Sequence, residues 1–422
     1  MACSGLLTIA THYPLPATRY LQPATRTRKI MNKSDLIEAA SNYLVHTYNR
    51  PEVVFERGEG VYLYDTEGNQ YLDFMSGIAV NGLGHSDPEW VTAVSEQAAQ
   101  LTHVSNLYHT APQLELARRL VENSFADRVF FANTGSEANE GAVKFARKWA
   151  KTHFHTNKTK IVAFTGGFHG RSIGALSLTY KEHYRAPFAP LMPGVTFVHF
   201  NDLEAARLAV DDDTCAVIVE PIQGEGGVNP ALAEFLQGLR ALCHNHHALL
   251  IFDEVQCGLG RTGQLWAHLN YAITPDIMTL AKPLAGGLPI GAILVTQAVA
   301  DVIQPGDHGS TFAGGPLVCR AAQVVFDRIN QPEFLQQVAA NGLYLQERLN
   351  QIGAPSVKAV RGLGLLVGVQ MDTAVAPLIT AARDKGLLLI SAGDNVLRLA
   401  PPLIITQEQI DTAVGVIQEC LH

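Results

Sequence analysis

This sequence lacks the motifs of the best-known metal and nucleotide sites. Its six cysteines, at positions 3, 215, 243, 257, 319 and 420, include no CxxC pair and no zinc-type spacing. Its sixteen histidines include no HExxH motif, and no GxxxxGK[ST] phosphate loop is present. We therefore expect free thiols, no metal and no Walker-type nucleotide site.

The chain also lacks a long apolar run and an excess of positive charge. No stretch approaches the roughly 20 apolar residues that a membrane helix needs. The formal net charge is −8 and the pI is about 6.0, so nucleic acid and anionic membranes are poor candidate partners. Small molecules are the favoured partners.

Acidic residues are missing from the N-terminal segment. No Asp or Glu precedes Asp35, whereas Arg19, Arg26, Arg28 and Lys29 are basic. This composition is typical of an organellar transit peptide, but a disordered tail, or a start at Met31, explains it as well. We favour the latter explanations and a cytoplasmic protein, with an organellar matrix as the alternative.

The 422 residues, 47% of them hydrophobic, are enough for a substantial core and more than one structural unit. Between residues 81 and 319, short apolar runs alternate with amphipathic segments, which predicts an α/β fold with a mostly parallel sheet and helices on both faces. A helix is expected from about Glu137. The expected strands are Val129–Ala132, Ile161–Phe164, Thr196–Phe200, Ala216–Val219, Ala248–Phe252 and Ile290–Val295.

The two ends of the chain have sequence patterns that differ from that of residues 81–319. After Ala321 we expect a long helix to about Ile352, strands at Leu363–Val369 and Leu387–Ser391, and a final helix from about Gln407. Residues 61–74 alternate around a turn at 67–69 and predict a hairpin. The expected units are an extension (1–30), a segment packing with the small domain (31–80), a large domain (81–320) and a C-terminal α+β small domain (321–422).

Three expected strand ends carry candidate chemistry. In "FFANTGSEANEGAVKFA", Asn133 to Ser136 lead from a strand into a helix, where free N–H groups and a hydroxyl form a phosphate cradle or an ordinary cap. In "AFTGGFHGRS", Phe168, His169 and Arg171 offer an aromatic face and a guanidinium, although such loops are often structural.

The third strand end, "HALLIFDEVQCGLGRTG", delivers Asp253 and Glu254. An apolar strand that ends in two acids is also typical of a Mg²⁺-binding ATPase strand, but the phosphate loop of such an enzyme is missing. In "DIMTLAKPLAGGLPIGA", Lys282 follows an apolar run, where burial would lower the pKa of its amine and make it a nucleophile.

Together these features match the needs of pyridoxal phosphate. Its aldehyde needs an amine, its ring nitrogen needs a buried carboxylate, and its phosphate needs fixed donors. The non-catalytic alternative, a binding protein on an enzyme scaffold, is disfavoured because it would not require Lys282 or Asp253.

The ordered motifs resemble those of the class III, fold-type I aminotransferases, and most of all the acetylornithine aminotransferase family. The resemblance covers the chain from about Ser41 onward. The motifs that carry it are "TGSEANEGAVKFAR", "FHGRSIGALSLT", "EPIQGEGGV", "IFDEVQCGLGRTG", "LAKPLAGGLPIGA", "HGSTFAGGPL" and "LRLAPPLIIT".

This resemblance implies a fold-type I pyridoxal phosphate enzyme and a role for each matching residue. Lys282 would form the internal aldimine and then shuttle a proton, and Asp253 would pair with the ring nitrogen. The other implied cofactor contacts are Gly135 and Ser136 with the phosphate, Phe168 and Val255 with the ring faces, Gln256 with the phenolic oxygen, and Thr311 with the phosphate of the neighbouring subunit of a homodimer.

For substrate, Arg398 would bind the α-carboxylate of glutamate, Glu225 would screen Arg398 when an ω-amino donor binds, and Arg171 would take a second carboxylate. The implied reaction moves the ω-amino group of N-acetylornithine to 2-oxoglutarate by a ping-pong route, as in arginine biosynthesis. Ornithine, succinylornithine and 4-aminobutyrate transaminases and glutamate-1-semialdehyde aminomutase share most of these residues. The chain departs from the family at Ser136, at Pro283 and at residues 313–315.

Overall fold

The computed structural model of the chain describes residues 32–154 and 157–421. The chain divides into two compact units. In the first, which ends at Val54, helix α1 (Lys33–Tyr43) begins after Asn32, whose side chain accepts a hydrogen bond from the Asp35 N–H. The second unit runs from Phe55 to His422. The hypotheses about residues 1–30 fall outside the described residues.

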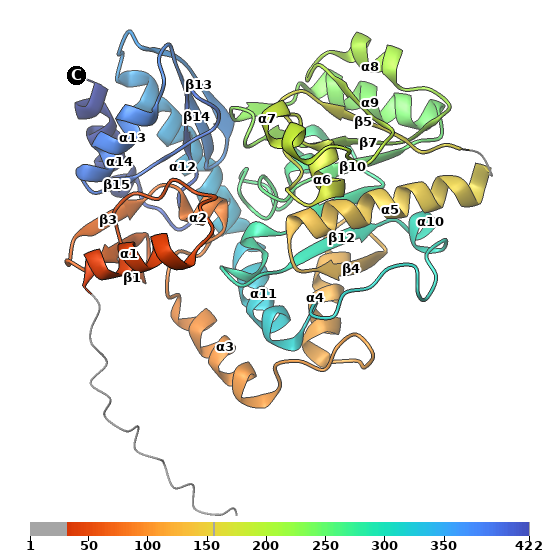
Figure 1. Cartoon of the computed structure of the whole chain (residues 1–422), viewed down its shortest axis with the longest axis horizontal. Coiled ribbons are helices and arrows are strands. Elements are labelled where there is room, and N and C mark those ends of the chain that lie inside the picture. The colour runs from red at the N-terminus through yellow and green to blue at the C-terminus, as the bar shows by residue number, and fades with distance from the viewer. Residues whose placement is uncertain (1–31, 155–156, 422) are drawn as a thin grey trace, which may run out of the picture. The chain divides into compact units, whose positions relative to one another are not determined.

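A seven-stranded sheet organises the second unit (Figure 1). Every neighbouring pair is parallel except the two pairs that involve β12, which is antiparallel to β11 and β4. The mostly parallel sheet is therefore confirmed. In spatial order the strands are β4 (Arg128–Ala132), β12 (Gly291–Val295), β11 (Ile277–Leu280), β10 (Leu249–Asp253), β7 (Thr214–Val219), β5 (Lys160–Phe164) and β6 (Val195–Val198).

Alternation along the buried strands separates two cores. Ile161, Ile218 and Ile251 pack in the core that contains α5 (Gly135–Phe154), and their chain neighbours pack in the core that contains α9 (Ala233–Asn245). Strand side chains point to opposite faces in turn, so helices cover both faces. The other helices around this sheet are α3 (Pro88–Gln100), α4 (Ala111–Glu122), α6 (Ile173–Leu178), α7 (Glu182–Arg185), α8 (Leu203–Ala209), α10 (Gln297–Ala300) and α11 (Pro316–Ile329).

Two smaller four-stranded sheets complete this unit, and the first of them joins its N-terminal strands to a strand near the C-terminus. The hairpin expected at residues 61–74 is present, and its second strand pairs with residues near the C-terminus. One sheet contains β1 (Phe55–Glu59), β2 (Tyr62–Asp65), β3 (Gln70–Asp73) and β15 (Leu387–Leu388); the other contains β13 (Val357–Leu363), β14 (Leu366–Met371), β17 (Val396–Leu399) and β16 (Ile390–Ser391).

The remaining elements are short or terminal. Residues 76 to 79, labelled α2 (Ser76–Ala79), form a left-handed turn, because all four have positive φ. The other elements are the strand pair β8 (Ile222–Gln223) and β9 (Asn229–Pro230), α12 (Pro332–Gln351), α13 (Ala376–Asp384), α14 (Gln407–Leu421) and 3-10 turns at Ala186–Phe188, Ala267–Tyr271 and Lys282–Ala285. No helix in the described part of the chain is long and apolar enough to cross a membrane.

Two expectations for the C-terminal part were wrong and one was right in part. The long helix is broken into α11 and α12 before Pro332, because proline has no N–H to continue a helix. The strand expected at Leu363–Val369 is present from Leu366 onward as part of β14, but its first residues are the end of β13 and a tight turn at Gly364, which has φ +53°. The stretch Leu387–Ser391 is divided between two sheets, and β17 was not recognised as a strand. The domain boundaries remain a prediction.

Candidate active site

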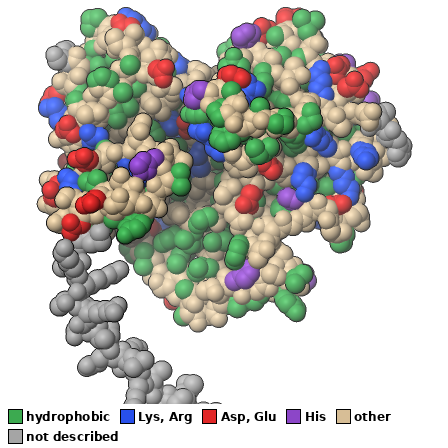
Figure 2. All heavy atoms as spheres, viewed as in Figure 1, with side chains coloured by type: hydrophobic (Ala, Val, Ile, Leu, Met, Phe, Trp, Pro, Cys, Tyr) green, Lys and Arg blue, Asp and Glu red, His purple; other side chains and the backbone are tan. Residues whose placement is uncertain are grey.

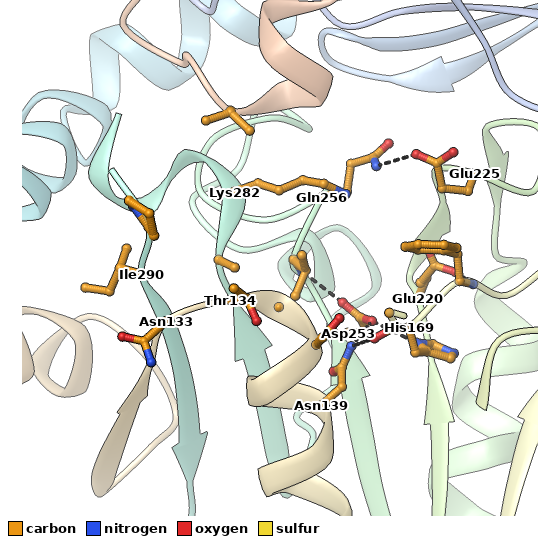
Figure 3. Close-up of a pocket in the computed structure, with 18 of the residues that line it drawn as sticks. Asn133, Thr134, Asn139, His169, Glu220, Glu225, Asp253, Gln256, Lys282 and Ile290 are labelled. Carbon is orange, nitrogen blue, oxygen red and sulfur yellow. Dashed lines mark hydrogen bonds and ion pairs between the residues drawn. The ribbon is translucent and has the colours of Figure 1, made fainter. Parts of the chain in front are cut away.

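A cavity of about 340 Å³ opens where the strands of the large sheet end (Figure 3). Residues that line it lie at the carboxyl ends of four strands, β4, β5, β7 and β10, and Lys282 follows a fifth strand, β11. Ligands of α/β sheets bind at this edge. The lining includes Gly135, Ser136, Phe168, Glu225, Asp253, Val255, Gln256 and Lys282, so eight of the eleven residues singled out in the sequence share one cavity.

Asp253 is buried at the floor of the cavity and is held by three donors. His169 Nδ1 and Asn139 Nδ2 each lie 2.7 Å from Asp253 Oδ2, and the Val255 N–H donates to Oδ1 over 3.0 Å. Because a carboxylate only accepts, the His169 proton must be on Nδ1. Burial opposes charge on His169, but the bond to Asp253 outweighs it and raises the pKa of the imidazole. The network fixes the Asp253 carboxyl group in position.

Lys282 begins the turn after β11, and its side chain extends into the cavity. Burial is the largest cause of its lowered pKa, and the positive charge of Arg398 adds to the effect while Glu225 opposes it. The lowered pKa expected from the sequence is therefore confirmed. A neutral amine is the nucleophilic form of lysine.

The loop between β4 and α5 combines a cap with free donors. Thr134 Oγ1 accepts from the Glu137 N–H over 3.2 Å, so Thr134 serves as the ordinary cap. As the first two residues of α5, Gly135 and Ser136 have no acceptor within the helix for their N–H groups. A Cβ on Gly170 would lie 2.2 Å from Ser136 Oγ, so only glycine there leaves room for the hydroxyl. The cap and the free donors are thus on different residues.

Two side chains provide apolar walls in the cavity. Phe168 and Val255 both line it, and both are fixed through their main chains. The Phe168 N–H donates to Glu220 Oε2 over 3.0 Å, and the Val255 N–H donates to Asp253. Burial raises the pKa of Glu220 to about 7, and the Asp253 charge adds to this rise.

An ion pair lies on the other side of the cavity. Arg398 Nη1 is 2.5 Å from Glu225 Oε1 and 3.0 Å from Gln256 Oε1, and Arg398 is only 1% exposed. Gln256 Nε2 also lies 3.4 Å from Glu225, as drawn in Figure 3. Burial would raise the pKa of Glu225, but Arg398 outweighs it and lowers that pKa. Arg398 is a buried strand residue and not a surface arginine.

Arg171 and Thr311 lie outside the cavity lining. The Arg171 N–H donates to Ser136 Oγ over 3.1 Å, which places this residue at the rim. Thr311 is exposed in a loop whose carbonyls are held by Asn106 and Gln113. Its role toward a neighbouring subunit stays a prediction.

Sequence reasoning assigned no role to three polar residues that line the cavity: Asn139, His169 and Glu220. Asn139 lies on the same face of α5 as Ala142, so its position in an apolar stripe was an available signal for a buried polar contact. His169 was noticed but given no partner, because its contact with Asp253 spans 84 positions.

Glu254, which had no assigned role, is buried and points away from the chemistry. Its carboxylate accepts from the Ala267 and His268 N–H groups and from His268 Nδ1, over 2.6 to 2.8 Å. It therefore fixes the turn at Ala267–Tyr271, and the acid pair expected of a Mg²⁺-binding strand is not formed.

Comparisons with known proteins agree with this geometry. A family model described as "Aminotransferase class-III" matches residues 43–421. The mitochondrial acetylornithine aminotransferase of Alnus glutinosa is 53% identical over 98% of this chain and 95% of its own length. Among solved structures, an ornithine aminotransferase of Toxoplasma gondii, described with pyridoxal phosphate at its active site, superposes with a TM-score of 0.90 at 32% identity, covering 93% of this chain and 95% of its own. The N-acetylornithine aminotransferase of Stenotrophomonas maltophilia gives 0.79 at 37% identity, covering 91% and 98%.

Proposed function

The chain belongs to the class III aminotransferases, which are pyridoxal phosphate enzymes, and on this premise we propose that it moves the ω-amino group of N-acetylornithine to 2-oxoglutarate. The products would be glutamate and the acetylated semialdehyde, in a step of arginine biosynthesis. The observation that carries the proposal is that one cavity is lined by Lys282, Asp253 and Glu225, and that Glu225 pairs with the buried Arg398.

The described residues fit pyridoxal phosphate. The amine of Lys282, the buried carboxylate of Asp253 and the N–H groups of Gly135 and Ser136 are the three kinds of partner that its aldehyde, ring nitrogen and phosphate need. When bound, this cofactor supplies an electron sink for the reaction. Phe168 and Val255 would contact the two ring faces, and Gln256 would bind the phenolic oxygen.

Asp253 and Lys282 each control a proton in this proposal. Asp253, held in position by His169 and Asn139, would keep a proton on the ring nitrogen of the cofactor. Lys282, with its lowered pKa, accepts a proton from the substrate carbon and returns it at the neighbouring position. Preorganised charge in a buried site needs no rearrangement during the reaction.

Arg398 and Glu225 would let one site accept two kinds of amine. When glutamate binds, its α-carboxylate replaces Glu225 on the guanidinium of Arg398, since a bidentate pair fixes orientation as well as charge. When the ω-amino donor binds, Glu225 remains paired and screens Arg398. Arg171 at the rim would take the second carboxylate.

A half-reaction panel tests the donor. The protein with bound cofactor is mixed in turn with acetylornithine, ornithine, succinylornithine and 4-aminobutyrate, and the loss of absorbance of the lysine-bound cofactor is followed by stopped flow. We expect acetylornithine to be among the fastest. If ornithine or 4-aminobutyrate is much faster, the donor is wrong although the family stands, and a glutamate-1-semialdehyde panel then tests the aminomutase alternative.

We also propose a homodimer with active sites at the subunit interface. Leu107, Tyr108 and Phe312 are 86%, 71% and 69% exposed on loops beside Thr311, and such apolar exposure favours a protein partner. Hydrophobic side chains also gather low in Figure 2, in the region of α3 and α4. Sedimentation of the wild type and of Phe312→Ser would test this, because the variant should dissociate at higher concentration.

The compartment is open to a direct test. The Alnus glutinosa relative is named mitochondrial, which favours the organellar alternative over the cytoplasmic one. A fluorescent protein fused behind residues 1–30 would enter an organelle if this basic segment is a transit peptide. A diffuse signal would support the cytoplasmic location.

A further inference from the structure

Arg171 has an aromatic support beneath its guanidinium group. Its Cζ lies 3.4 Å from the centroid of the Tyr184 ring, which is the distance of close stacking, and 5.8 Å from the centroid of the Phe168 ring. Across residues 32–154 and 157–421, no carboxylate forms an ion pair with Arg171. The cation is thus held through its face, and its N–H groups are left for a ligand.

Helix α7, which carries Tyr184, offers no unpaired carboxylate to Arg171. Helix α7 contains Glu182, but this carboxylate lies 2.5 Å from Arg185 Nη2 and is therefore paired. Lys181 places a second cation 5.7 Å from the centroid of the same Tyr184 ring. The surroundings of Arg171 therefore favour an anion.

The two ends of Arg171 are fixed by different parts of the fold. Its main-chain N–H donates to Ser136 Oγ at the start of α5, and its head group lies on Tyr184 of α7. A long arginine side chain loses rotamer freedom when it binds, so holding it beforehand reduces the cost of binding. Stacking leaves the edge of the guanidinium free for bidentate pairing with a carboxylate.

We propose that Tyr184 is a specificity-determining positioning residue, whose ring holds Arg171 ready for the second carboxylate of a dicarboxylic substrate. This inference rests on the role proposed above for Arg171. It adds a residue outside the cavity lining to the parts of the chain that separate dicarboxylic from monocarboxylic substrates.

Two acceptors of equal length test the proposal. 2-Oxoglutarate and 2-oxopentanoate have the same five-carbon chain, but the second has a methyl group in place of the distal carboxylate. The measured quantity is the ratio of kcat/KM for the two acceptors in the holoenzyme. Because each ratio comes from one protein preparation, partial misfolding of a variant cancels.

We expect Tyr184→Leu to lower this ratio about tenfold, since it removes the ring under the cation. Tyr184→Phe keeps the ring and should stay within about twofold of the wild type. In an Arg171→Met background, Tyr184→Leu should have no further effect on the ratio, because the residue acts through Arg171. An unchanged ratio in Tyr184→Leu, or an equal loss in Tyr184→Phe, would overturn the proposal.

The same series separates this proposal from the one on which it rests. If Arg171→Met loses the preference for 2-oxoglutarate and Tyr184→Leu keeps it, only the role of Tyr184 is wrong. If Arg171→Met keeps the preference, the assignment of Arg171 fails and that of Tyr184 fails with it.

Discussion

Replacing Glu225 by glutamine should shift the preference of the enzyme toward glutamate. In the proposed reaction, the α-carboxylate of glutamate displaces the Glu225 carboxylate from Arg398; in the structure these two side chains lie 2.5 Å apart. Arg398 is 1% exposed, so solvent screens this pair weakly. Glutamine has the same shape and still accepts a hydrogen bond, but it carries no charge.

The size of the effect follows from the kind of hydrogen bond that is lost. A hydrogen bond between two charged groups contributes about 1.5–3 kcal/mol and a weaker one about 1 kcal/mol, so the substrate has about 0.5–2 kcal/mol less to overcome. Each 1.4 kcal/mol is a factor of ten, which predicts a KM for glutamate that is lower by about 2- to 30-fold. For the ω-amino donor, kcat/KM should fall by a similar factor, because Arg398 is left unscreened.

The assay is steady-state transamination in both directions with Glu225→Gln and, as the matched control, Glu225→Asp. The aspartate variant keeps the charge and should retain more of the wild-type donor-to-glutamate selectivity than the glutamine variant. If Glu225→Gln leaves that selectivity unchanged, the reasoning about this pair is refuted.

Three further predictions concern the other parts of the site. Asp253→Asn should keep the cofactor bound but lower kcat by at least about 100-fold, as loss of a preorganised charge does. The control Glu254→Gln should lower Tm and leave kcat of the folded enzyme within about twofold. Normal turnover in Asp253→Asn would remove Asp253 from the reaction. Gly170→Ala should raise the Kd for pyridoxal phosphate, measured by equilibrium dialysis, because the added Cβ would lie 2.2 Å from Ser136 Oγ. Gly415→Ala is the control and should leave this Kd unchanged, because its added Cβ would have no other atom within 4 Å. The rate at which the apo-protein captures pyridoxal phosphate should rise with pH through the lowered pKa of Lys282. Arg398→Gln removes a positive charge and should move the midpoint of this rise to higher pH, whereas Glu225→Gln removes a negative charge and should move it to lower pH. Shifts of the opposite sign would contradict the assigned causes.

The sequence predicted the large sheet well because its central strands are buried on both faces. Runs such as Ala248–Phe252 are short and apolar, and the chain between them is amphipathic, so local patterns decide these elements. The C-terminal part was harder, since Leu387–Ser391 is one apolar run that the fold divides between two sheets. Only tertiary pairing determines that division.

The site was predictable where a residue's chemistry is visible in its local motif. Lys282 and Asp253 each follow an apolar run, and the resemblance to a family placed Arg398 and Glu225. The contacts of Asn139 and His169 with Asp253 were not predicted, because they join residues 114 and 84 positions apart. Tyr184 was missed for the same reason, as nothing near it in the sequence indicates a contact with Arg171.

The central claim is that residues from separate strand ends form one pyridoxal phosphate site with Lys282 as its covalent anchor. Borohydride reduction of the holoenzyme, followed by proteolysis and mass spectrometry, tests it most directly. We predict that the reduced cofactor is attached to the peptide that contains Lys282 and is absent from that peptide in Lys282→Ala. A cofactor attached to another lysine of the wild type, or to none, would contradict the claim.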